Sequence, residues 1–238
     1  MAILDLRWHL RAWRSQRRWA RTREAIRQWL LTAPDGFGEL LLFGASAGWM
    51  MPDDFLARFR RIDAVDFEWA ASPLFRLRHA GVIRRQRIEV AFHRTEALSR
   101  LEDLLSMRPR ALVVFDNVLG QYTLTCRDVA LAEERLAGLQ KRLAGRAWGT
   151  VHDALSGQGR LLPLDDEPLP VPLAAGASWP EAALLGPIDA RGDWRDHLTR
   201  GVLPAASASV MIPWQLTPGY WHWLQAGWVA PGPAAPLR

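Results

Sequence analysis

The chain has 238 residues, 49% of them hydrophobic, with 30 basic and 25 acidic side chains and a formal net charge of +5. This length and composition are typical of one α/β domain with a sizeable core. The single cysteine, Cys126, excludes an intrachain disulfide and a thiolate metal cluster, and it is typical of a reducing compartment. Nearly all basic residues are arginines, a bias that often reflects genome composition as much as function. We therefore do not take the positive charge as evidence for a nucleic-acid partner.

Residues 3–31 are predicted to form one or two helices, because large apolar side chains recur there at helical spacing with arginines between them. One interpretation is that an aromatic stripe packs on the domain and leaves the arginines in water. The alternative is a basic helix that binds an anionic partner or a membrane surface. Charges throughout this segment argue against a signal peptide, and prolines break the uncharged segment 201–237, so we expect a cytoplasmic protein without a membrane span.

Strands and helices then alternate along the chain, which predicts βαβ units and a doubly wound, mostly parallel sheet. The expected strands are residues 39–44, 61–68, 87–94, 110–117, 146–153, 207–215 and 220–229. The expected helices are residues 52–59, 72–81, 95–107, 128–145 and 194–204. The last two strands are expected to pair antiparallel at an edge of the sheet. Prolines and glycines in residues 156–187 predict a long irregular insert that could form a lid over the site.

A turn of small residues, from Gly44 to Gly48, follows the first expected strand. Small residues at this place allow a tight turn and let the backbone approach a ligand closely. Asp66 comes near the end of the second strand, twenty residues after Ser46, and an acid at this spacing can bind ribose hydroxyl groups. The turn and the acid together predict a site for a nucleotide-like cofactor.

Over residues 36–230 this order of elements resembles that of the class I S-adenosylmethionine-dependent methyltransferases. The resemblance implies an α/β fold with a seven-stranded sheet of order 3-2-1-4-5-7-6 and an antiparallel last strand. It also implies S-adenosylmethionine as the cofactor and a small-molecule or protein group as the methyl acceptor. The expected organisation is therefore a basic helical extension, residues 1–35, followed by a Rossmann-like methyltransferase domain, residues 36–238.

The resemblance further implies which residues bind the cofactor. The first loop would surround the methionine part, the acid after the second strand would hold the ribose, and the turn after the third strand would lie beside the adenine. The residues so implied are Gly44, Ala45, Ser46, Gly48, Asp66, Glu96 and Asp116. Two departures from the family pattern stand out: Ser46 replaces the middle glycine of the loop, and Leu42 replaces an acid that helps to bind the cofactor amine. A protein that keeps this fold as a binding scaffold without catalysis is therefore an alternative.

Polar residues near the ends of the fourth and fifth strands are the candidates for chemistry. Asp116 could hydrogen-bond an acceptor amine or take its proton, and His152 could act as a base near neutral pH. For each, the competing interpretation is a helix cap or a loop hydrogen bond. The candidates for binding the acceptor are Asn117, Gln121, Tyr122, Asp153 and Trp214.

The turn also spells G-x-S-x-G, which is typical of a serine nucleophile elbow. Asp116 and His152 follow Ser46 in hydrolase order. However, few strands precede this turn, no glycine-rich oxyanion segment lies upstream, and Asp66 would have no role. The remaining histidines lack the spacing of metal ligands, so we predict no metal and a structural or exposed place for each: His79, His93, His197 and His222.

Overall fold

The computed structural model describes residues 2–125, 128–161 and 168–231. Cys126 and part of the expected insert, residues 162–167, lie outside the described residues. The described strands are β1 (Glu39–Phe43), β2 (Arg61–Val65), β3 (Glu89–His93), β4 (Leu112–Asp116), β5 (Trp148–Gly159), β6 (Val171–Leu173), β7 (Ala190–Asp196), β8 (Ser209–Thr217) and β9 (Tyr220–Val229). The described helices are α1 (Ala2–Arg14), α2 (Ala20–Leu31), α3 (Asp53–Leu56), α4 (Ala71–Arg78), α5 (Ala80–Gln86), η1 (Ala97–Arg100), α6 (Leu101–Met107), α7 (Val118–Thr125), α8 (Val129–Ala137), α9 (Leu139–Arg142), α10 (Glu181–Leu185) and η2 (Gly186–Ile188).

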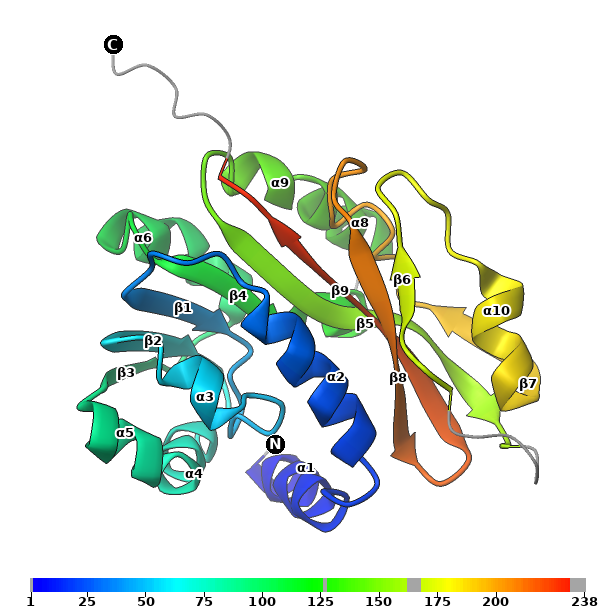
Figure 1. Cartoon of the computed structure of the whole chain (residues 1–238), viewed down its shortest axis with the longest axis horizontal. Coiled ribbons are helices and arrows are strands. Elements are labelled where there is room, and N and C mark those ends of the chain that lie inside the picture. Colours follow the sequence, from blue (N-terminus) through cyan, green and yellow to red (C-terminus); the bar gives the residue numbers. More distant parts are fainter. Residues whose placement is uncertain (1, 126–127, 162–167, 232–238) are drawn as a thin grey trace.

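The sheet has the order β3-β2-β1-β4-β5-β9-β8-β6, and β7 pairs with β5 (Figure 1). The first five strands are parallel, and β9 runs antiparallel to both β5 and β8. This confirms the mostly parallel α/β fold, in which the last strand lies between the fifth strand and its hairpin partner. The described sheet has nine strands instead of seven, because β6 and β7 add to it. The β8–β9 hairpin is therefore not at the edge as predicted, since β6 pairs with β8 and forms the edge.

Helices cover both faces of the sheet, and the first strand shows why. The apolar run of β1 alternates between two cores: Leu40 and Leu42 contribute to one, and Leu41 and Phe43 to the other. The first core takes side chains from α2 to α5, and the second from α6 to α9. Leu42, which stands where the resembled family has an acid, is therefore a core residue.

Two N-terminal helices are present, as predicted, and α2 packs against the C-terminal hairpin. The indole nitrogen of Trp19 donates to the backbone carbonyl oxygen of Gln215 (3.1 Å). The hydroxyl of Thr22 donates to the backbone carbonyl oxygen of Pro213 (2.8 Å). Trp19 and Ile26 are fully buried in the first core. These contacts support the interpretation that an aromatic stripe packs on the domain. None of the helices in the described part of the chain is long and apolar enough to cross a membrane.

The structure corrects two predictions near residue 156. The fifth strand does not end at residue 153, because β5 continues to Gly159 after a bulge between Asp153 and Leu155. The expected helix 194–204 is wrong, because β7 pairs with this extension of β5. A Cβ at Gly157 would lie only 2.7 Å from the ring of Trp194, so the glycine leaves room for the indole of the neighbouring strand.

The expected irregular insert is more ordered than predicted. Its described residues include the end of β5, β6, α10 and η2. Apolar side chains of this segment pack against Met211, Trp221 and Trp223 of the hairpin and form a third core with them. The contributing residues of the segment are Leu173, Trp179, Leu184 and Ile188. The insert extends the sheet and covers its own core.

Candidate functional site

A cavity of about 540 Å³ opens beside the carboxyl ends of β1, β2 and β4. Its lining includes most of the predicted site residues: Gly44, Ser46, Asp66, Glu96, Asp116, Asn117, Gln121, Tyr122 and Trp214. Ala45 and Gly48 lie in the same turn, buried beneath its surface. His152 and Asp153 do not line this cavity. The structure thus places nine of the thirteen candidate residues around one cavity.

The small-residue turn and the acid after β2 bind each other. Gly44 (φ +77°) and Ser46 (φ +44°) adopt left-handed conformations, which bend the chain sharply. A Cβ at Gly44 would lie 2.5 Å from the carbonyl oxygen of Asp116, so only glycine lets the turn approach β4. The backbone N–H of Ser46 donates to Oδ2 of Asp66 (2.7 Å), and that of Glu68 donates to Oδ1 (2.9 Å).

The cavity is acidic, although the chain as a whole is basic. Four carboxylates contribute to its lining, Asp66, Glu68, Glu96 and Asp116, and no arginine, lysine or histidine is among the described residues that line it. Burial raises the pKa of Asp66 to about 6, against the effect of its two backbone donors. Burial, and then the charge of Asp66, raise the pKa of Asp116 to about 7. These two carboxyl groups therefore titrate close to neutral pH.

Aromatic residues that the sequence analysis did not select complete the walls. Trp8 of α1 donates from its indole nitrogen to the hydroxyl of Ser46 (3.3 Å), and its ring centroid lies 6.5 Å from that of Trp214. Trp49, which follows the turn, donates to Nδ1 of His9 (3.1 Å). Periodicity could mark Trp8 as part of a helix, but its contact with a turn 38 residues away depends on tertiary structure.

His152 lies away from the cavity, which corrects its prediction as a catalytic base. Val151 lines the cavity, and successive residues of a strand point to opposite faces, so His152 faces the other side of β5. It is fully buried, and Nδ1 lies 2.9 Å from the hydroxyl of Thr150. Burial lowers the pKa of His152 to about 4. A hydrolase arrangement of Ser46, Asp116 and His152 is therefore not assembled.

Asp153 lies behind the cavity wall and holds Asn117. The amide of Asn117 donates to Oδ2 of Asp153 (3.1 Å), and its Oδ1 accepts the backbone N–H of Asp153 (2.8 Å). Asn117 has a left-handed conformation (φ +51°), and this pair of hydrogen bonds stabilises it. Burial alone would raise the pKa of Asp153, but the hydrogen bond to His222 (2.7 Å) and the donors around it lower the pKa below its usual value.

Asp153, His197 and His222 offer ligand atoms that lie within 4.8 Å of one another, so this buried cluster has the residue types of a metal site. Each side chain already has hydrogen-bond partners. Nδ1 of His197 donates to the carbonyl oxygen of Gly120 (2.9 Å), and Nε2 lies 2.9 Å from the hydroxyl of Ser156. Nε2 of His222 is buried without a hydrogen-bond partner among the described residues, so the network leaves one ring nitrogen of the cluster unsatisfied, and the absence of a metal stays a prediction.

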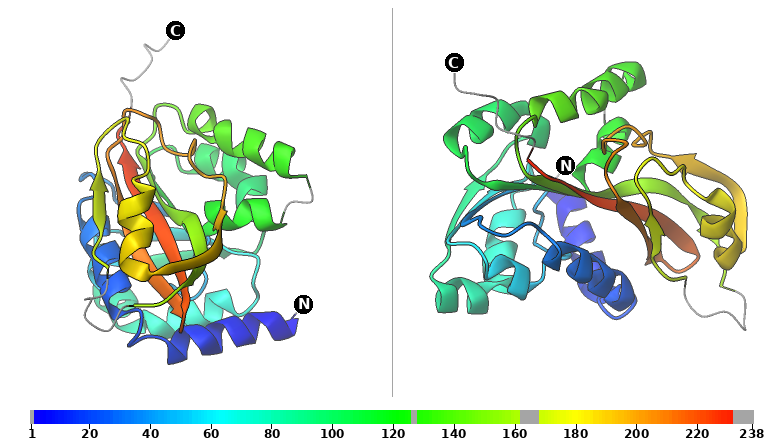
Figure 2. Two further views of the ribbon diagram at one scale, coloured as in Figure 1. Left: turned by 90° about the vertical axis from the view of Figure 1, so that its right-hand side faces the viewer. Right: turned by 45° about the horizontal axis from the view of Figure 1, so that its top comes forward.

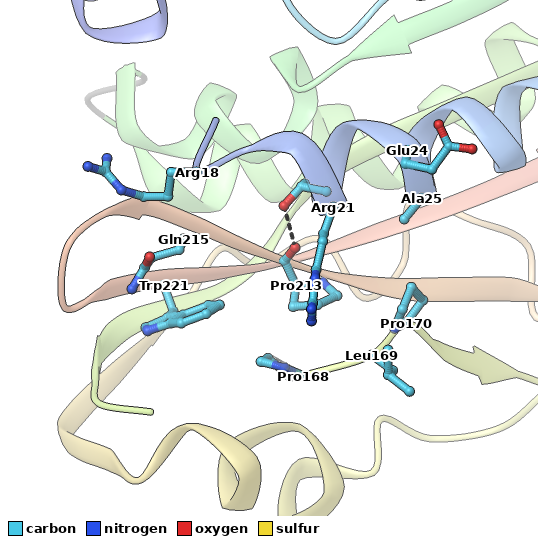
Figure 3. Close-up of a pocket in the computed structure, with 11 residues that line it drawn as sticks. Arg18, Arg21, Glu24, Ala25, Pro168, Leu169, Pro170, Pro213, Gln215 and Trp221 are labelled. Atoms are coloured by element: carbon cyan, nitrogen blue, oxygen red, sulfur yellow. Dashed lines mark hydrogen bonds between the residues drawn. The ribbon is translucent and has the colours of Figure 1, made fainter. Parts of the chain in front are cut away.

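A second cavity, of about 420 Å³, lies between α2, β8 and the segment Pro168–Pro170 (Figure 3). The hydrogen bond from Thr22 to Pro213 crosses its wall. The described part of the expected insert lines this cavity and contributes no residue to the 540 Å³ cavity. The prediction of a lid over the candidate site was therefore wrong for the described residues.

No protein-family model matches the sequence, and no curated protein matches it. Similar solved structures include the N-methyltransferase NodS from Bradyrhizobium japonicum WM9 with S-adenosyl-L-homocysteine, at 11% identity, a TM-score of 0.44 and coverage of 86% of this chain and 85% of that one. The glycopeptide N-methyltransferase MtfA with S-adenosyl-L-methionine has 13% identity, a TM-score of 0.40 and coverage of 87% and 93%. A putative O-methyltransferase from Nostoc punctiforme PCC 73102 has 13% identity, a TM-score of 0.41 and coverage of 87% and 55%.

Proposed function

We propose that the chain is an S-adenosylmethionine-dependent methyltransferase whose cofactor binds in the 540 Å³ cavity. The observation that carries this proposal is the lining, which combines four carboxylates with indole and phenol rings. Besides one carboxylate, S-adenosylmethionine carries an ammonium and a sulfonium charge and an aromatic base, so its two cationic groups and its ring suit these walls. A dinucleotide would instead place its phosphates against carboxylates, which is unfavourable.

In this proposal Asp66 holds the ribose. Each oxygen of Asp66 accepts one backbone N–H and keeps a second lone pair for a hydroxyl group. Glu96 caps η1 by accepting hydrogen bonds from the N–H groups of Leu98 and Ser99. In this proposal it lines the part of the cavity where the adenine binds. Because Leu42 is a core residue, we assign the counter-charge for the cationic end of the cofactor to Asp116.

Asp116 and its neighbours would act on the methyl acceptor. When bound, the cofactor supplies an electrophilic methyl group on a sulfonium. Burial raises the pKa of Asp116 to about 7, and the cationic cofactor would favour its ionised form, which could accept a proton from the acceptor. Asn117, fixed by Asp153, and Gln121 and Tyr122 on α7 would orient the acceptor for in-line attack. The acceptor is a small molecule or a protein group.

Calorimetric titration of the whole chain with S-adenosylhomocysteine and S-adenosylmethionine tests this proposal. We expect micromolar binding of both, and Asp66→Ala should weaken it at least about tenfold through the loss of charged hydrogen bonds. The matched control is Asp103→Ala, which removes an exposed acid of α6 that pairs with Arg100 and does not line the cavity. Equal losses in both variants would contradict the ribose assignment. No binding at millimolar ligand would contradict the proposal and favour the non-catalytic scaffold that Leu42 and Ser46 suggest.

A further inference from the structure

The outward face of α1 exposes large apolar side chains. Leu6, Leu10 and Trp13 follow one another at spacings of four and three residues, so they form one stripe along the helix. They are between 45% and 65% exposed. His9 and Ala12 are buried on the side that packs against the domain. The helix therefore has a packed side and a separate apolar side that faces water.

The loop after β2 extends this apolar surface. Phe67 is 59% exposed and Trp69 is 44% exposed. Between them, Oε2 of Glu68 lies 3.1 Å from Nε2 of His9, so the loop adjoins α1. Figure 2 shows α1 along the margin of the molecule, outside the layers of the sheet. We call this surface the α1 face: Leu6, Leu10, Trp13, Phe67 and Trp69.

A stripe of positive charge accompanies the α1 face. Arg7, Arg11 and Arg14 repeat at the same spacing as the apolar stripe, one position later, and all three are exposed. Residues 6–23 contain seven arginines and no acid, whereas residues 24–238 hold 23 basic and 24 acidic side chains. The excess positive charge of the chain is thus concentrated around α1.

We propose that the α1 face docks on an anionic lipid surface, with α1 lying in the plane of the interface. The apolar stripe would enter the boundary between headgroups and acyl chains, and the arginines would contact anionic headgroups. A nucleic acid would supply the phosphates but would leave the leucines and tryptophans in water. Phe67 of the α1 face also lines the 540 Å³ cavity, but the proposal does not rest on the proposed function, because Leu6, Leu10, Trp13 and the arginines of α1 do not line that cavity.

Sedimentation of the whole chain with vesicles tests this proposal. One set contains equal parts of phosphatidylcholine and phosphatidylglycerol, and the other contains phosphatidylcholine alone. We expect at least about tenfold stronger partitioning to the anionic vesicles, and a loss of the difference at high salt. Equal partitioning to both vesicles, or none to either, would overturn the proposal.

Two variants separate the contributions. Leu10→Gln/Trp13→Gln removes apolar contact without changing charge, and Arg7→Gln/Arg11→Gln/Arg14→Gln removes charge only. Each should lower partitioning to anionic vesicles at least about tenfold. All five side chains are exposed, so the fold should persist, which circular dichroism checks.

Matched controls make equal changes elsewhere. Met107→Gln/Leu131→Gln removes exposed apolar side chains of α6 and α8, and Arg110→Gln/Arg191→Gln/Arg195→Gln removes three exposed charges. These controls should partition as the unaltered chain does, and equal losses in controls and variants would overturn the proposal. Binding to duplex DNA without binding to anionic vesicles would assign the α1 face to nucleic acid instead.

Discussion

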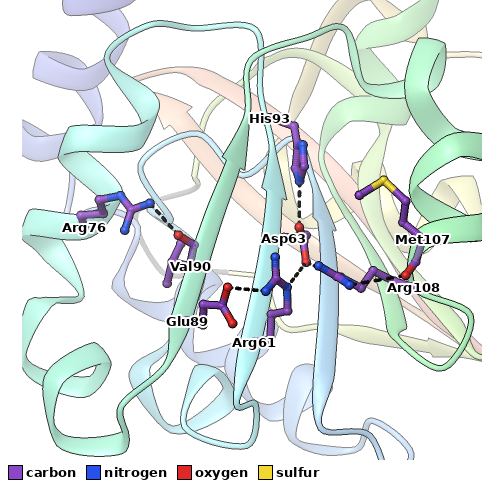
Figure 4. A network of polar contacts seen from close by, with 8 residues as sticks. All are labelled: Arg61, Asp63, Arg76, Glu89, Val90, His93, Met107 and Arg108. Atoms are coloured by element: carbon purple, nitrogen blue, oxygen red, sulfur yellow. Dashed lines mark hydrogen bonds and ion pairs between the residues drawn. The ribbon is translucent and has the colours of Figure 1, made fainter.

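Two acids of the same segment, Asp63 and Asp66, meet opposite environments. Both side chains are buried; Asp63 lies in the middle of β2, and Asp66 directly follows the carboxyl end of this strand. Figure 4 shows that Asp63 accepts hydrogen bonds from Arg61 (2.8 Å) and Arg108 (2.9 Å), with Nε2 of His93 2.8 Å away. Asp66 instead accepts backbone N–H groups beside the 540 Å³ cavity.

The pKa values of the two acids diverge accordingly. Burial alone would raise the pKa of Asp63, but its arginine and histidine partners lower it to about 2. Burial raises the pKa of Asp66 to about 6 and, with the charge of Asp66, that of Asp116 to about 7. The charge of Asp63 is balanced by arginines of the protein, Arg61 and Arg108, so we interpret this carboxylate as structural. For Asp66 and Asp116, the proposed function assigns the same stabilisation to a cationic ligand.

The largest expected effect is on the structural acid. Asp63→Ala should lower the free energy of unfolding by about 3 kcal/mol, because it leaves partly buried cations without their carboxylate. Urea denaturation measures this loss. The control Asp103→Ala, at an exposed acid, should change stability by less than about 0.5 kcal/mol.

The pH dependence of this effect has a definite sign. The folded-state pKa of Asp63 lies below its unfolded value, so its stabilising contribution is complete above about pH 4 and is lost as the pH falls through about 2. A stability difference between Asp63→Ala and the unaltered chain that stayed constant over this window would contradict the ion-pair account.

The cavity acid should respond in the opposite direction. The folded-state pKa of Asp116 lies above its unfolded value, so its charge destabilises the fold as the pH rises from about 4 through 7. Asp116→Asn should therefore raise the free energy of unfolding by at least about 2 kcal/mol at about pH 8, and by almost nothing near pH 4. Urea denaturation at both pH values checks this, with exposed Asp193→Asn as control. A loss of stability at about pH 8 would contradict it.

A smaller effect should distinguish the two cofactor forms. S-adenosylmethionine carries one more positive charge than S-adenosylhomocysteine, so it gains more when Asp66 and Asp116 ionise. The ratio of their affinities should rise in favour of S-adenosylmethionine by about tenfold between about pH 5 and pH 8. Paired calorimetric titrations measure this ratio. In Asp116→Asn the rise should shrink, and an unchanged rise would remove Asp116 from the account.

The smallest effect is expected at Ser46. Among the described residues, the partner of its hydroxyl is the indole nitrogen of Trp8, at 3.3 Å, so Ser46→Ala should change stability and cofactor affinity by less than about 1 kcal/mol. It should also leave any methyl-transfer activity nearly unaltered, which a methyl-transfer assay checks once an acceptor is found. A complete loss of activity would revive a nucleophilic role for this serine.

Local sequence patterns predicted the parts of the fold that depend on local signals. Apolar runs such as that of β1 marked the buried parallel strands, and the small-residue turn and Asp66 marked the cavity mouth. Polar residues at the carboxyl end of β4, Asp116 and Asn117, are expected at the cavity because parallel strands share their carboxyl edge, and the structure places them there.

Other features could not be predicted because they depend on tertiary pairing. The extension of β5 contains glycines that are typical of loops, and only the partner strands β7 and β9 make it a strand. For the same reason the prediction places the last three residues of β7, 194–196, in a helix, and it places His152 at a strand end although His152 lies within β5. Trp8 reaches the cavity only because α1 folds back over the turn that contains Ser46.

Proton release on cofactor binding tests the central claim most directly. With pKa values of about 6 and about 7, Asp66 and Asp116 should be partly protonated at about pH 6.5, and a cationic ligand should ionise them. Calorimetric titration in two buffers of different ionisation enthalpy counts the protons. We expect a release approaching about one proton per S-adenosylmethionine bound, and fewer with S-adenosylhomocysteine. Binding of both ligands without proton release, or no binding of either, would contradict the account.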